Sequence, residues 1–519
     1  MRPRLGGIAA LAIAAMLTAA PAAPAAPAAA AAAPCASQAT GGEWPMYGHD
    51  VANTRTQPGE HALGPAAAAD LTPAWVFSTG STGDASQLTT TPVVAGGCAF
   101  IGSFNGYVYA LDASSGHVVW QRRLDAPNPG SGGVIVGAAA MYGHTVVFLV
   151  NEFTAPYAIA LDRSTGAVIW QSPPFAPPLT SSAAQAGSYT NASPIIAGGF
   201  VVAGYSPPEG DPTASGGFSL IDAATGQIVA TTPTISPADA ANGYAGGGLW
   251  STPAYDPATR YLYWGAGNPS SKDKQDPTTD AILKIDLDRS RSTFGQIVAA
   301  YPGNVDQYAS ALQQLSQTPA CEVSADPSVP DPLDDPVCGQ LDLDFGAATN
   351  LFRTSDGREL VGDLQKSGVY HVADAATMRP AWTALVGASC QVCNAASTAV
   401  YHGAVEGVGT PVGAMFSLAI DTGQTNWLSP VADGIHYEST SAADGVVWTV
   451  DSQANLDGFD DATGQVLVRR PLSLDAGAPI VNNTSSGIAI AEDKLFVAAG
   501  GAGYASTTGY LVAYRAAVP

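Results

Sequence analysis

Short apolar stretches alternate with turn residues along almost the whole chain, and the same arrangement recurs. The segments "GYVYALDASSGHVVWQ" (106–121) and "PYAIALDRSTGAVIWQ" (156–171) are near copies of one another. Each predicts a β-branched strand, a tight turn and a second strand. The aspartate before the turn can accept hydrogen bonds from the backbone that follows it, and the glycine supplies a positive φ. The pattern therefore predicts a repeated β-hairpin.

Further copies of this hairpin follow at 216–230, 280–290, 368–382, 415–428 and 458–468, with a truncated copy at 509–517. Upstream of each copy lies another pair of short apolar strands, as in 91–103 and 192–204. Four antiparallel strands per repeat of roughly 40–60 residues are typical of a β-propeller blade. The sequence therefore predicts an all-β fold, an eight-bladed β-propeller of four-stranded antiparallel blades.

The last repeat reaches the C-terminus without an outer strand. The segment "LTPAWVFST" (71–79) has the pattern of an outer strand but no partners before it. We expect this N-terminal strand to close the last blade, because an open ring would leave a sheet edge unpaired. We also expect a set of tryptophans near the turns to pack between blades, namely Trp120, Trp170, Trp382 and Trp427.

The first residues have a different composition. Arg2 and Arg4 precede a short apolar stretch and a long Ala/Pro run. This is the pattern of a signal peptide, and its apolar core is too short for a permanent membrane anchor. We therefore divide the chain into a signal peptide (1–33), an N-terminal entry segment (34–70) and a propeller (71–519). We expect export to the periplasm or the outside, with no transmembrane segment.

Export permits disulfides. Six cysteines do not fix their pairing by arithmetic alone. Closeness in sequence favours Cys321–Cys338 and Cys390–Cys393 and leaves Cys35–Cys98 by elimination. The insert 304–340 is too long for a blade loop, and we expect its cysteine pair to pin it just ahead of Asp344 as a partial lid.

The charge balance narrows the possible functions. The chain has 20 Lys+Arg against 43 Asp+Glu. A nucleic-acid partner needs a basic face, so this class is excluded. The 7 histidines show no metal-binding spacing, and no Gly-x-Ser-x-Gly elbow is present, so a hydrolase or lyase has no motif to support it.

The Asp-Ala-Thr-Gly turns, the tryptophans after them and the segment "WPMYGHDVANTR" (44–55) resemble the pyrroloquinoline quinone (PQQ)-dependent alcohol dehydrogenase family. The likeness covers about residues 40–519. Through "GNPSS" and "LDFGAATNLF" it is nearest to the polyvinyl alcohol dehydrogenase-like members. The repeat alone does not decide the chemistry, because scaffold propellers of outer-membrane assembly share it and bind no cofactor.

Two segments are similar to the parts of that family that hold the cofactor. "GGGLWSTPAYDPATRYLYWGAGNPSS" places Trp250 as the floor under the quinone and, 18 residues on, Asn268 as a metal ligand. "AGYSPPEG" places Ser206 near a PQQ carboxylate and Glu209 as a metal ligand. Each residue taken alone also has an ordinary interpretation, as a core tryptophan, a turn asparagine before proline or a solvated glutamate.

"LDLDFGAATNLF" is similar to the segment that carries the family's catalytic base, which implies that Asp344 is both base and metal ligand. Asp342 lies on the same face of an expected strand and is a rival. The lysine of "LVGDLQKSGVYHVADA", Lys366, matches the basic residue that contacts the quinone oxygens. Gly346 stands where lanthanide-using relatives carry an aspartate, so the resemblance implies calcium.

The resemblance implies that the protein oxidises an alcohol, including a secondary or polymeric one, by hydride transfer to PQQ beside Ca²⁺. Oxygen-only ligands suit a hard cation such as Ca²⁺. Electrons would pass to an external acceptor such as a cytochrome, because covalent haem needs a histidine where "CQVCN" has Asn394. The segment 132–148 lacks the family's adjacent cysteines, so the upper wall of the cofactor slot must be built otherwise. The alternative is a non-catalytic secreted scaffold for protein or ligand binding.

Overall fold

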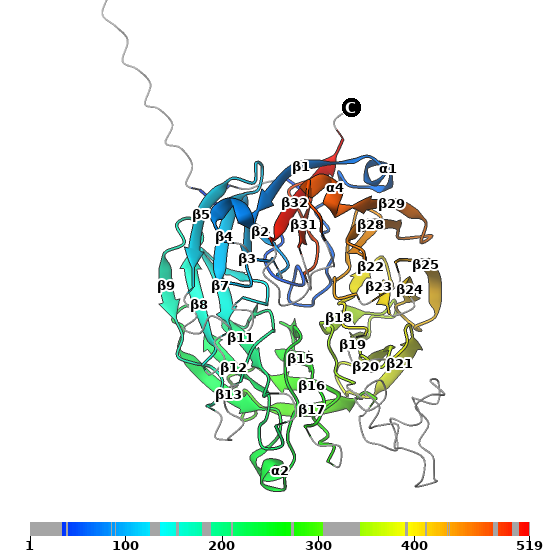
Figure 1. Ribbon diagram of the computed structural model, residues 1–519. Helices are drawn as coiled ribbons and strands as arrows, with labels where there is room; N and C mark the ends of the chain where they lie inside the picture. Colours follow the sequence, from blue (N-terminus) through cyan, green and yellow to red (C-terminus); the bar gives the residue numbers. More distant parts are fainter. Residues whose placement is uncertain are drawn as a thin grey trace, which may run out of the picture.

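The computed structural model places strands around a central channel (Figure 1). It describes residues 34–517 with gaps at 38–39, 85, 89, 125–134, 152–154, 179–187, 209–210, 271–273, 305–342, 390–392, 411–412, 433, 435, 481–485 and 501–507. The strands form eight four-stranded sheets. The predicted eight-bladed β-propeller is therefore confirmed.

Blades are numbered here in chain order, and their strands run from the channel outward. Blade 1 comprises β2 (Val93–Ala95), β3 (Cys98–Gly102), β4 (Tyr107–Asp112) and β5 (Val118–Arg123). Blade 2 comprises β6 (Ala140–Tyr142), β7 (Thr145–Val150), β8 (Tyr157–Asp162) and β9 (Val168–Gln171). Blade 3 comprises β10 (Ile195–Ala197), β11 (Phe200–Tyr205), β12 (Gly217–Asp222) and β13 (Ile228–Pro233). Blade 4 comprises β14 (Ala254–Asp256), β15 (Tyr261–Gly265), β16 (Ala281–Asp286) and β17 (Ile297–Pro302).

The second half of the ring repeats this order. Blade 5 comprises β18 (Asn350–Arg353), β19 (Glu359–Leu364), β20 (Val369–Asp374) and β21 (Pro380–Leu385). Blade 6 comprises β22 (Ala399–Tyr401), β23 (Ala404–Gly409), β24 (Ala414–Ala419) and β25 (Thr425–Pro430). Blade 7 comprises β26 (Ser441–Ala443), β27 (Val446–Val450), β28 (Asn455–Asp460) and β29 (Val466–Pro471). Blade 8 comprises β30 (Ala489–Ala491), β31 (Lys494–Ala499), β32 (Tyr510–Ala516) and β1 (Leu71–Ser78). Short helices are α1 (Pro65–Ala68), η1 (Thr79–Thr82), α2 (Pro237–Ala241) and α4 (Leu472–Ala476).

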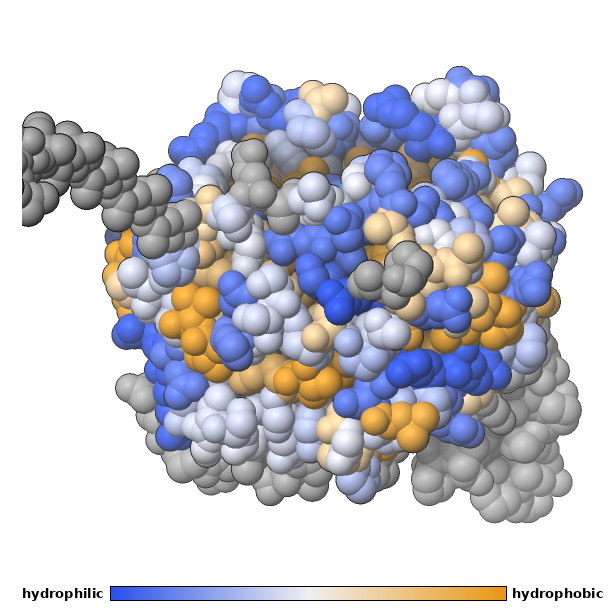
Figure 2. Space-filling model, turned by 90° about the horizontal axis from the view of Figure 1, so that it is seen from above, coloured by the Kyte–Doolittle hydropathy of each residue, from blue (hydrophilic) through white to orange (hydrophobic). Residues whose placement is uncertain are grey.

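Blade 8 joins the two ends of the propeller. Strand β1 pairs antiparallel with β32, and the order in the sheet is β1-β32-β31-β30. The expected closure by the N-terminal strand is therefore confirmed. On the side of the molecule that carries β1, hydrophobic residues lie in separate patches between hydrophilic ones (Figure 2).

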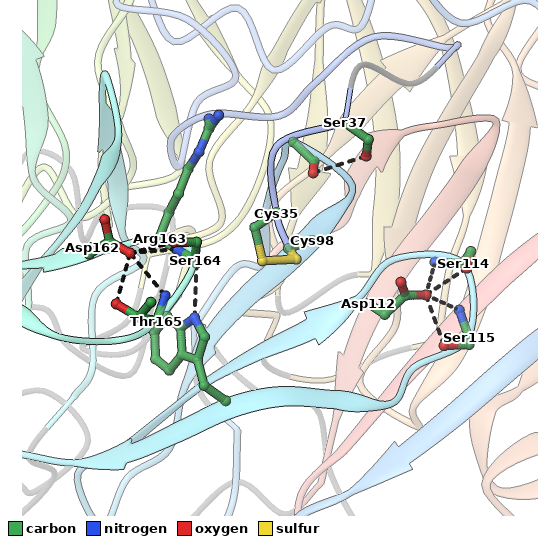
Figure 3. The surroundings of a disulfide bond; sticks show 12 residues. Cys35, Ser37, Cys98, Asp112, Ser114, Ser115, Asp162, Arg163, Ser164 and Thr165 are labelled. Atoms are coloured by element: carbon green, nitrogen blue, oxygen red, sulfur yellow. Dashed lines mark hydrogen bonds between the residues drawn. A yellow bond between two sulfur atoms is a disulfide. The ribbon is translucent and has the colours of Figure 1, made fainter. Parts of the chain in front are cut away.

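The recurring turn has the chemistry that the repeat predicts. In blade 1, one carboxylate oxygen of Asp112 accepts hydrogen bonds from the backbone and hydroxyl groups of Ser114 and Ser115. Gly116 then adopts a φ of 72°. Figure 3 shows this turn and its counterpart at Asp162 on either side of a disulfide.

Tryptophans of the outer strands connect neighbouring blades. Each indole Nε1 donates to a carbonyl in the turn of the next blade, and its ring covers the glycine of that turn. The pairs are Trp75–Ala113, Trp120–Arg163, Trp170–Ala223, Trp382–Ile420 and Trp427–Asp461. The packing of tryptophans between blades is therefore confirmed, and Trp75 adds a fifth case. We call each such contact a tryptophan staple.

Residues 44–57, which we call the strap, run across the channel inside the ring (Figure 1, dark blue). Their backbone bonds to the innermost strands of six blades through the pairs Trp44–Val94, Pro45–Met141, Val51–Tyr255, Ala52–Leu351, Thr54–Val400 and Arg55–Ala442. The Gln57 side chain adds a bond to the carbonyl of Ile490 in blade 8. The strap thus spans nearly the whole ring from within.

A disulfide joins Cys35 to Cys98 at the start of β3 (Figure 3), as expected. Cys393 is disulfide-bonded too. The rest of the expected pairing, through Cys321, Cys338 and Cys390, lies outside the described residues. The signal peptide and residues 305–340 of the expected lid also lie outside them.

Among the described residues, no helix has the length and apolar character needed to cross a membrane.

Candidate functional site

The carboxylate of Asp344 is the centre of the site. Its Oδ2 accepts hydrogen bonds from Trp250 Nε1 at 3.1 Å and from Lys366 Nζ at 3.0 Å. Its Oδ1 accepts one from the backbone N–H of Asn268. The Asp344 and Lys366 side chains are each 9% exposed. Four residues that the sequence analysis singled out, far apart in the chain, therefore meet at one buried carboxylate.

Blade 4 supplies two of these residues from neighbouring loops. Trp250 precedes β14 and Asn268 follows β15, so two strands lie between them as expected. The backbone of the Asn268 loop is fixed by its neighbours. Gly247 N–H donates to the Asn268 carbonyl, and Gly246 forms a bridge with Pro269. These contacts between the two loops hold the Asn268 N–H in place to donate to Asp344.

Blade 5 supplies the charged pair. Lys366 lies in the turn between β19 and β20, and its backbone N–H donates to the Asp344 carbonyl at 3.0 Å. Its ammonium lies 5.2 Å from the centroid of the Trp250 ring, where it gains a cation–π attraction.

Asp344 itself lies six residues before β18, in a segment without strand structure. The expectation of a strand there was wrong: residues 343–349 form no strand, and strand pairing begins at Asn350. Asp342, the rival, lies outside the described residues.

Glycines make the room for this arrangement. A Cβ on Gly346 would lie 2.4 Å from the Cη2 of Trp250, and one on Gly267 would lie 2.9 Å from Oδ1 of Asp344. A side chain at position 346 would therefore displace the indole. The absence of an aspartate at this position, noted in the sequence, thus has a steric reason as well.

Blade 3 contributes a buried hydroxyl beside this centre. Ser206 follows β11, is 2% exposed, and its Oγ has no hydrogen-bond partner among the described residues. The space next to it is open only because residue 248 is glycine, since a Cβ there would lie 2.5 Å from that Oγ. Ser188 Oγ is also buried without a partner in the described part of the chain, although nothing in the sequence distinguished it. Glu209 lies outside the described residues.

A polar network lies behind Asp344, and the sequence analysis missed it. His371 binds the Tyr301 hydroxyl through Nδ1 at 3.2 Å and Gln365 through Nε2 at 3.1 Å. Burial lowers the pKa of His371 to about 4. Asp363 accepts a hydrogen bond from Thr349 Oγ1 at 2.7 Å, and burial raises its pKa well above the usual value. Tyr301, Asp363 and His371 occupy strand positions, and Thr349 and Gln365 lie next to strands. No motif marks any of them.

The donor chemistry fits the expected cofactor. Asn268 and Asp344 offer only oxygen, which suits a hard cation. The Ser206 hydroxyl, which has no partner in the described part of the chain, is a buried polar atom that a polar ligand group would satisfy. Among the described residues, no group of three or more His, Cys, Asp or Glu side chains has metal-binding geometry. Glu209 is not one of the described residues.

The comparisons with known proteins agree with the fold. A family model described as outer membrane protein assembly factor BamB matches residues 74–246. The structure matches a quinohemoprotein alcohol dehydrogenase from Comamonas testosteroni with a TM-score of 0.67 and 16% identity, over 91% of this chain and 80% of that chain. The chain has the fold of the quinoprotein alcohol dehydrogenases. The resemblance seen in its repeats is thereby confirmed at the level of the fold.

Two further solved structures define the range of this fold. A europium-containing methanol dehydrogenase matches with a TM-score of 0.67 and 16% identity, over 91% of this chain and 98% of that chain. BamB from Moraxella catarrhalis matches with a TM-score of 0.51 and 15% identity, over 86% of this chain and 99% of that chain. No curated protein matches the chain. Enzymes and an assembly factor thus share the propeller, and the site must decide between them.

Proposed function

We propose that this protein oxidises an alcohol to a carbonyl compound with PQQ and Ca²⁺, and passes the electrons to an external acceptor such as a cytochrome. The observation that carries the proposal is the convergence of the Trp250 indole, the Lys366 ammonium and the Asn268 backbone on the Asp344 carboxylate. A flat aromatic face, a cation and a carboxylate within hydrogen-bonding reach are what a quinone oxidation site needs.

The proposed roles follow from the chemistry of each group. Trp250 and Ser206 bind PQQ, and Lys366 faces its oxygens. Glu209, Asn268 and Asp344 hold Ca²⁺. PQQ, when bound, supplies the two-electron acceptor, and Ca²⁺ supplies a Lewis acid.

Asp344 acts as the base in this proposal and takes up the proton of the substrate hydroxyl at a carboxylate oxygen. Lys366, 3.0 Å from that carboxylate, supplies the positive charge that stabilises negative charge as it develops. The low exposure of both side chains keeps water from screening their charges.

A second candidate function is a cofactor-free binding scaffold, which the match of residues 74–246 to the BamB description favours. The buried ion pair favours the enzyme. Removing two charges from water costs on the order of several kcal/mol per ion, even after the surrounding protein relaxes. Catalysis gives this cost a use, because the proposed reaction needs a base and a cation at one point, and binding by a scaffold does not need the pair of Lys366 and Asp344.

The proposal also covers the organisation and location of the chain. We propose that residues 1–33 direct export to the periplasm or the outside, that 34–70 form the entry segment and that 71–519 form the propeller with its insert at 304–340. The disulfide between Cys35 and Cys98 supports an oxidising compartment.

Reconstitution of the purified protein with PQQ and Ca²⁺ tests the function. Dye-linked oxidation of primary, secondary and polymeric alcohols is measured for the wild type and for Asp344→Asn. We expect activity that needs both cofactors and falls by at least about 100-fold in the variant, as for loss of a general base.

Asp356→Asn is the matched control, because Asp356 is an exposed carboxylate of the same blade. The control retains wild-type activity in our account. A wild type that takes up no quinone would support the scaffold instead.

A further inference from the structure

The strap carries one side chain that the fold alone does not explain. Asn53 is completely buried and has a φ of 54°. Its Nδ2 points at three backbone carbonyls, those of Thr252 at 3.2 Å, Pro253 at 2.8 Å and Thr349 at 3.0 Å. One amide group thus bonds to two blades at once.

The three carbonyls belong to the segments that carry the site. Thr252 and Pro253 lie two and three positions after Trp250 in blade 4, and Thr349 lies five positions after Asp344 in blade 5. The two segments also contact each other, because Thr349 N–H donates to the Thr252 carbonyl at 3.2 Å. Asn53 therefore lies beneath the junction across which Trp250 donates to Asp344.

The backbone of the same residue strengthens the connection. The carbonyl of Asn53 accepts a hydrogen bond from Nδ2 of Asn350 at 2.6 Å. Asn350 is the first residue of β18 and belongs to blade 5. Asn53 thus binds blade 5 through both its side chain and its backbone.

Asparagine suits this place for two physical reasons. Its NH₂ group donates two hydrogens to carbonyls, which aspartate does not offer when ionised. Asparagine also tolerates the left-handed backbone region better than most side chains. The fit is tight, because a Cβ on Gly48 would lie 2.0 Å from Oδ1 of Asn53.

We propose that Asn53 is a positioning residue for the site: it holds the segments of Trp250 and Asp344 at the separation that their hydrogen bond requires. This inference rests on the proposed function for its consequence, since a displaced indole would bind PQQ less tightly. No tryptophan staple joins blades 4 and 5 among the described residues; polar contacts connect them instead, including those of Asn53 and the bonds of Tyr263 and Lys284 to the Ala375 carbonyl.

The test follows Trp250 directly in the protein without cofactor. The full chain is labelled with 5-fluorotryptophan, and the fluorine resonance of Trp250 is assigned with Trp250→Phe. Asn53→Gly removes the amide and retains a residue that accepts the positive φ. We expect the Trp250 resonance to shift and broaden in this variant.

Gln57→Ala is the matched control, because it removes another strap amide that donates to a carbonyl, that of Ile490 in blade 8. The control should lower the melting temperature about as much as Asn53→Gly and leave the Trp250 resonance in place. Affinity for PQQ, from a fluorescence titration, should fall about tenfold in Asn53→Gly alone, the expected scale for lost hydrogen bonds.

Asn53→Asp keeps the shape and the tolerance for positive φ, and it decides the question if Asn53→Gly does not fold. An unchanged Trp250 resonance in the folded variant, or an equal change in Gln57→Ala, would overturn the proposal. A wild type that binds no PQQ would instead refute the proposed function, and the fluorine shift would still report on Asn53.

Discussion

The junctions between blades are of two kinds, and the junction that carries the site is not the repeated kind. At the junction of blades 2 and 3, the Trp170 indole donates to the Ala223 carbonyl and covers Gly226. At the junction of blades 4 and 5, Ala299 stands at the tryptophan position of the register. Met378 stands at the glycine position and takes a φ of 55°.

The carbonyl that receives the indole N–H elsewhere has other donors at this junction. Ala375 accepts hydrogen bonds at 2.8 Å from both the Tyr263 hydroxyl and the Lys284 ammonium. The same junction contains the Tyr301–His371 bond and the site itself. The stapled junctions keep the repeat, whereas at this junction polar donors take the place of the indole.

Two other junctions also depart from the repeat. Ala230 and Val468 stand at the tryptophan positions of blades 3 and 7. Within the described ranges, blade 4, which supplies Trp250 and Asn268, therefore has no tryptophan staple on either side. Such a staple and the polar contacts that replace it should respond differently to mutation and to pH.

The largest effect is expected at a stapled junction. Trp170→Ala should lower the free energy of unfolding by about 3–5 kcal/mol, because it removes a buried ring and leaves a cavity. Denaturant unfolding measures this loss. Trp170→Phe keeps most of the ring and should cost about 1 kcal/mol, the scale of the lost hydrogen bond. The affinity for the quinone at the distant site should be unaffected. A large loss of this affinity in Trp170→Ala would contradict the separation between stapled junctions and the junction that carries the site.

The site junction should be the acid-sensitive one. Burial lowers the pKa of His371 to about 4 from 6.5, so the unfolded chain binds its proton more tightly than the native protein. This contribution to stability is complete above pH 6.5 and is lost as the pH falls toward 4. Between pH 7 and pH 5 the wild type should lose about 1–2 kcal/mol that His371→Gln does not lose. Asp363, whose pKa is raised, acts in the opposite direction. Parallel curves for wild type and variant would contradict this account of the junction.

The smallest effect is expected at the outer contact of the same junction. Lys284→Met should change the free energy of unfolding by only about 1 kcal/mol, since the lost bonds to Ala375 and Ala376 are offset by relief from burying a charge. Tyr263→Phe removes one bond to the same carbonyl and should cost about 1 kcal/mol or less. If either variant lost as much free energy of unfolding as Trp170→Ala, the polar contacts would stabilise their junction as strongly as a tryptophan staple does.

The fold could be predicted because its information is local. The aspartate, the glycine and the flanking apolar alternation of each hairpin occur within about 15 residues, and eight copies reveal the ring. The four clustered site residues could be identified because a resemblance to a family supplied their spacing. The strap could not be predicted, because its partners lie between 50 and more than 400 residues away and its segment has no periodic pattern.

The polar residues that take the place of the tryptophan between blades 4 and 5 could not be predicted from the sequence either. Lys284 and Tyr263 alternate along strands as ordinary strand residues do, and only the ring brings them to Ala375. The segment of Asp344 was expected to be a strand from its period-two pattern, but its backbone forms no strand, and the carboxylate lies beside Trp250. Local pattern cannot report a departure that tertiary contacts impose.

The most direct test of the central claim is a titration of the cofactor-free protein with PQQ, followed by tryptophan fluorescence with Ca²⁺ and with a chelator. If the Trp250 face is the quinone floor, the wild type shows saturable quenching that needs Ca²⁺. Trp250→Phe then loses that quenching, whereas Trp170→Phe retains it. Quenching that is equal in both variants, or absent from the wild type, would contradict a quinone site between blades 4 and 5.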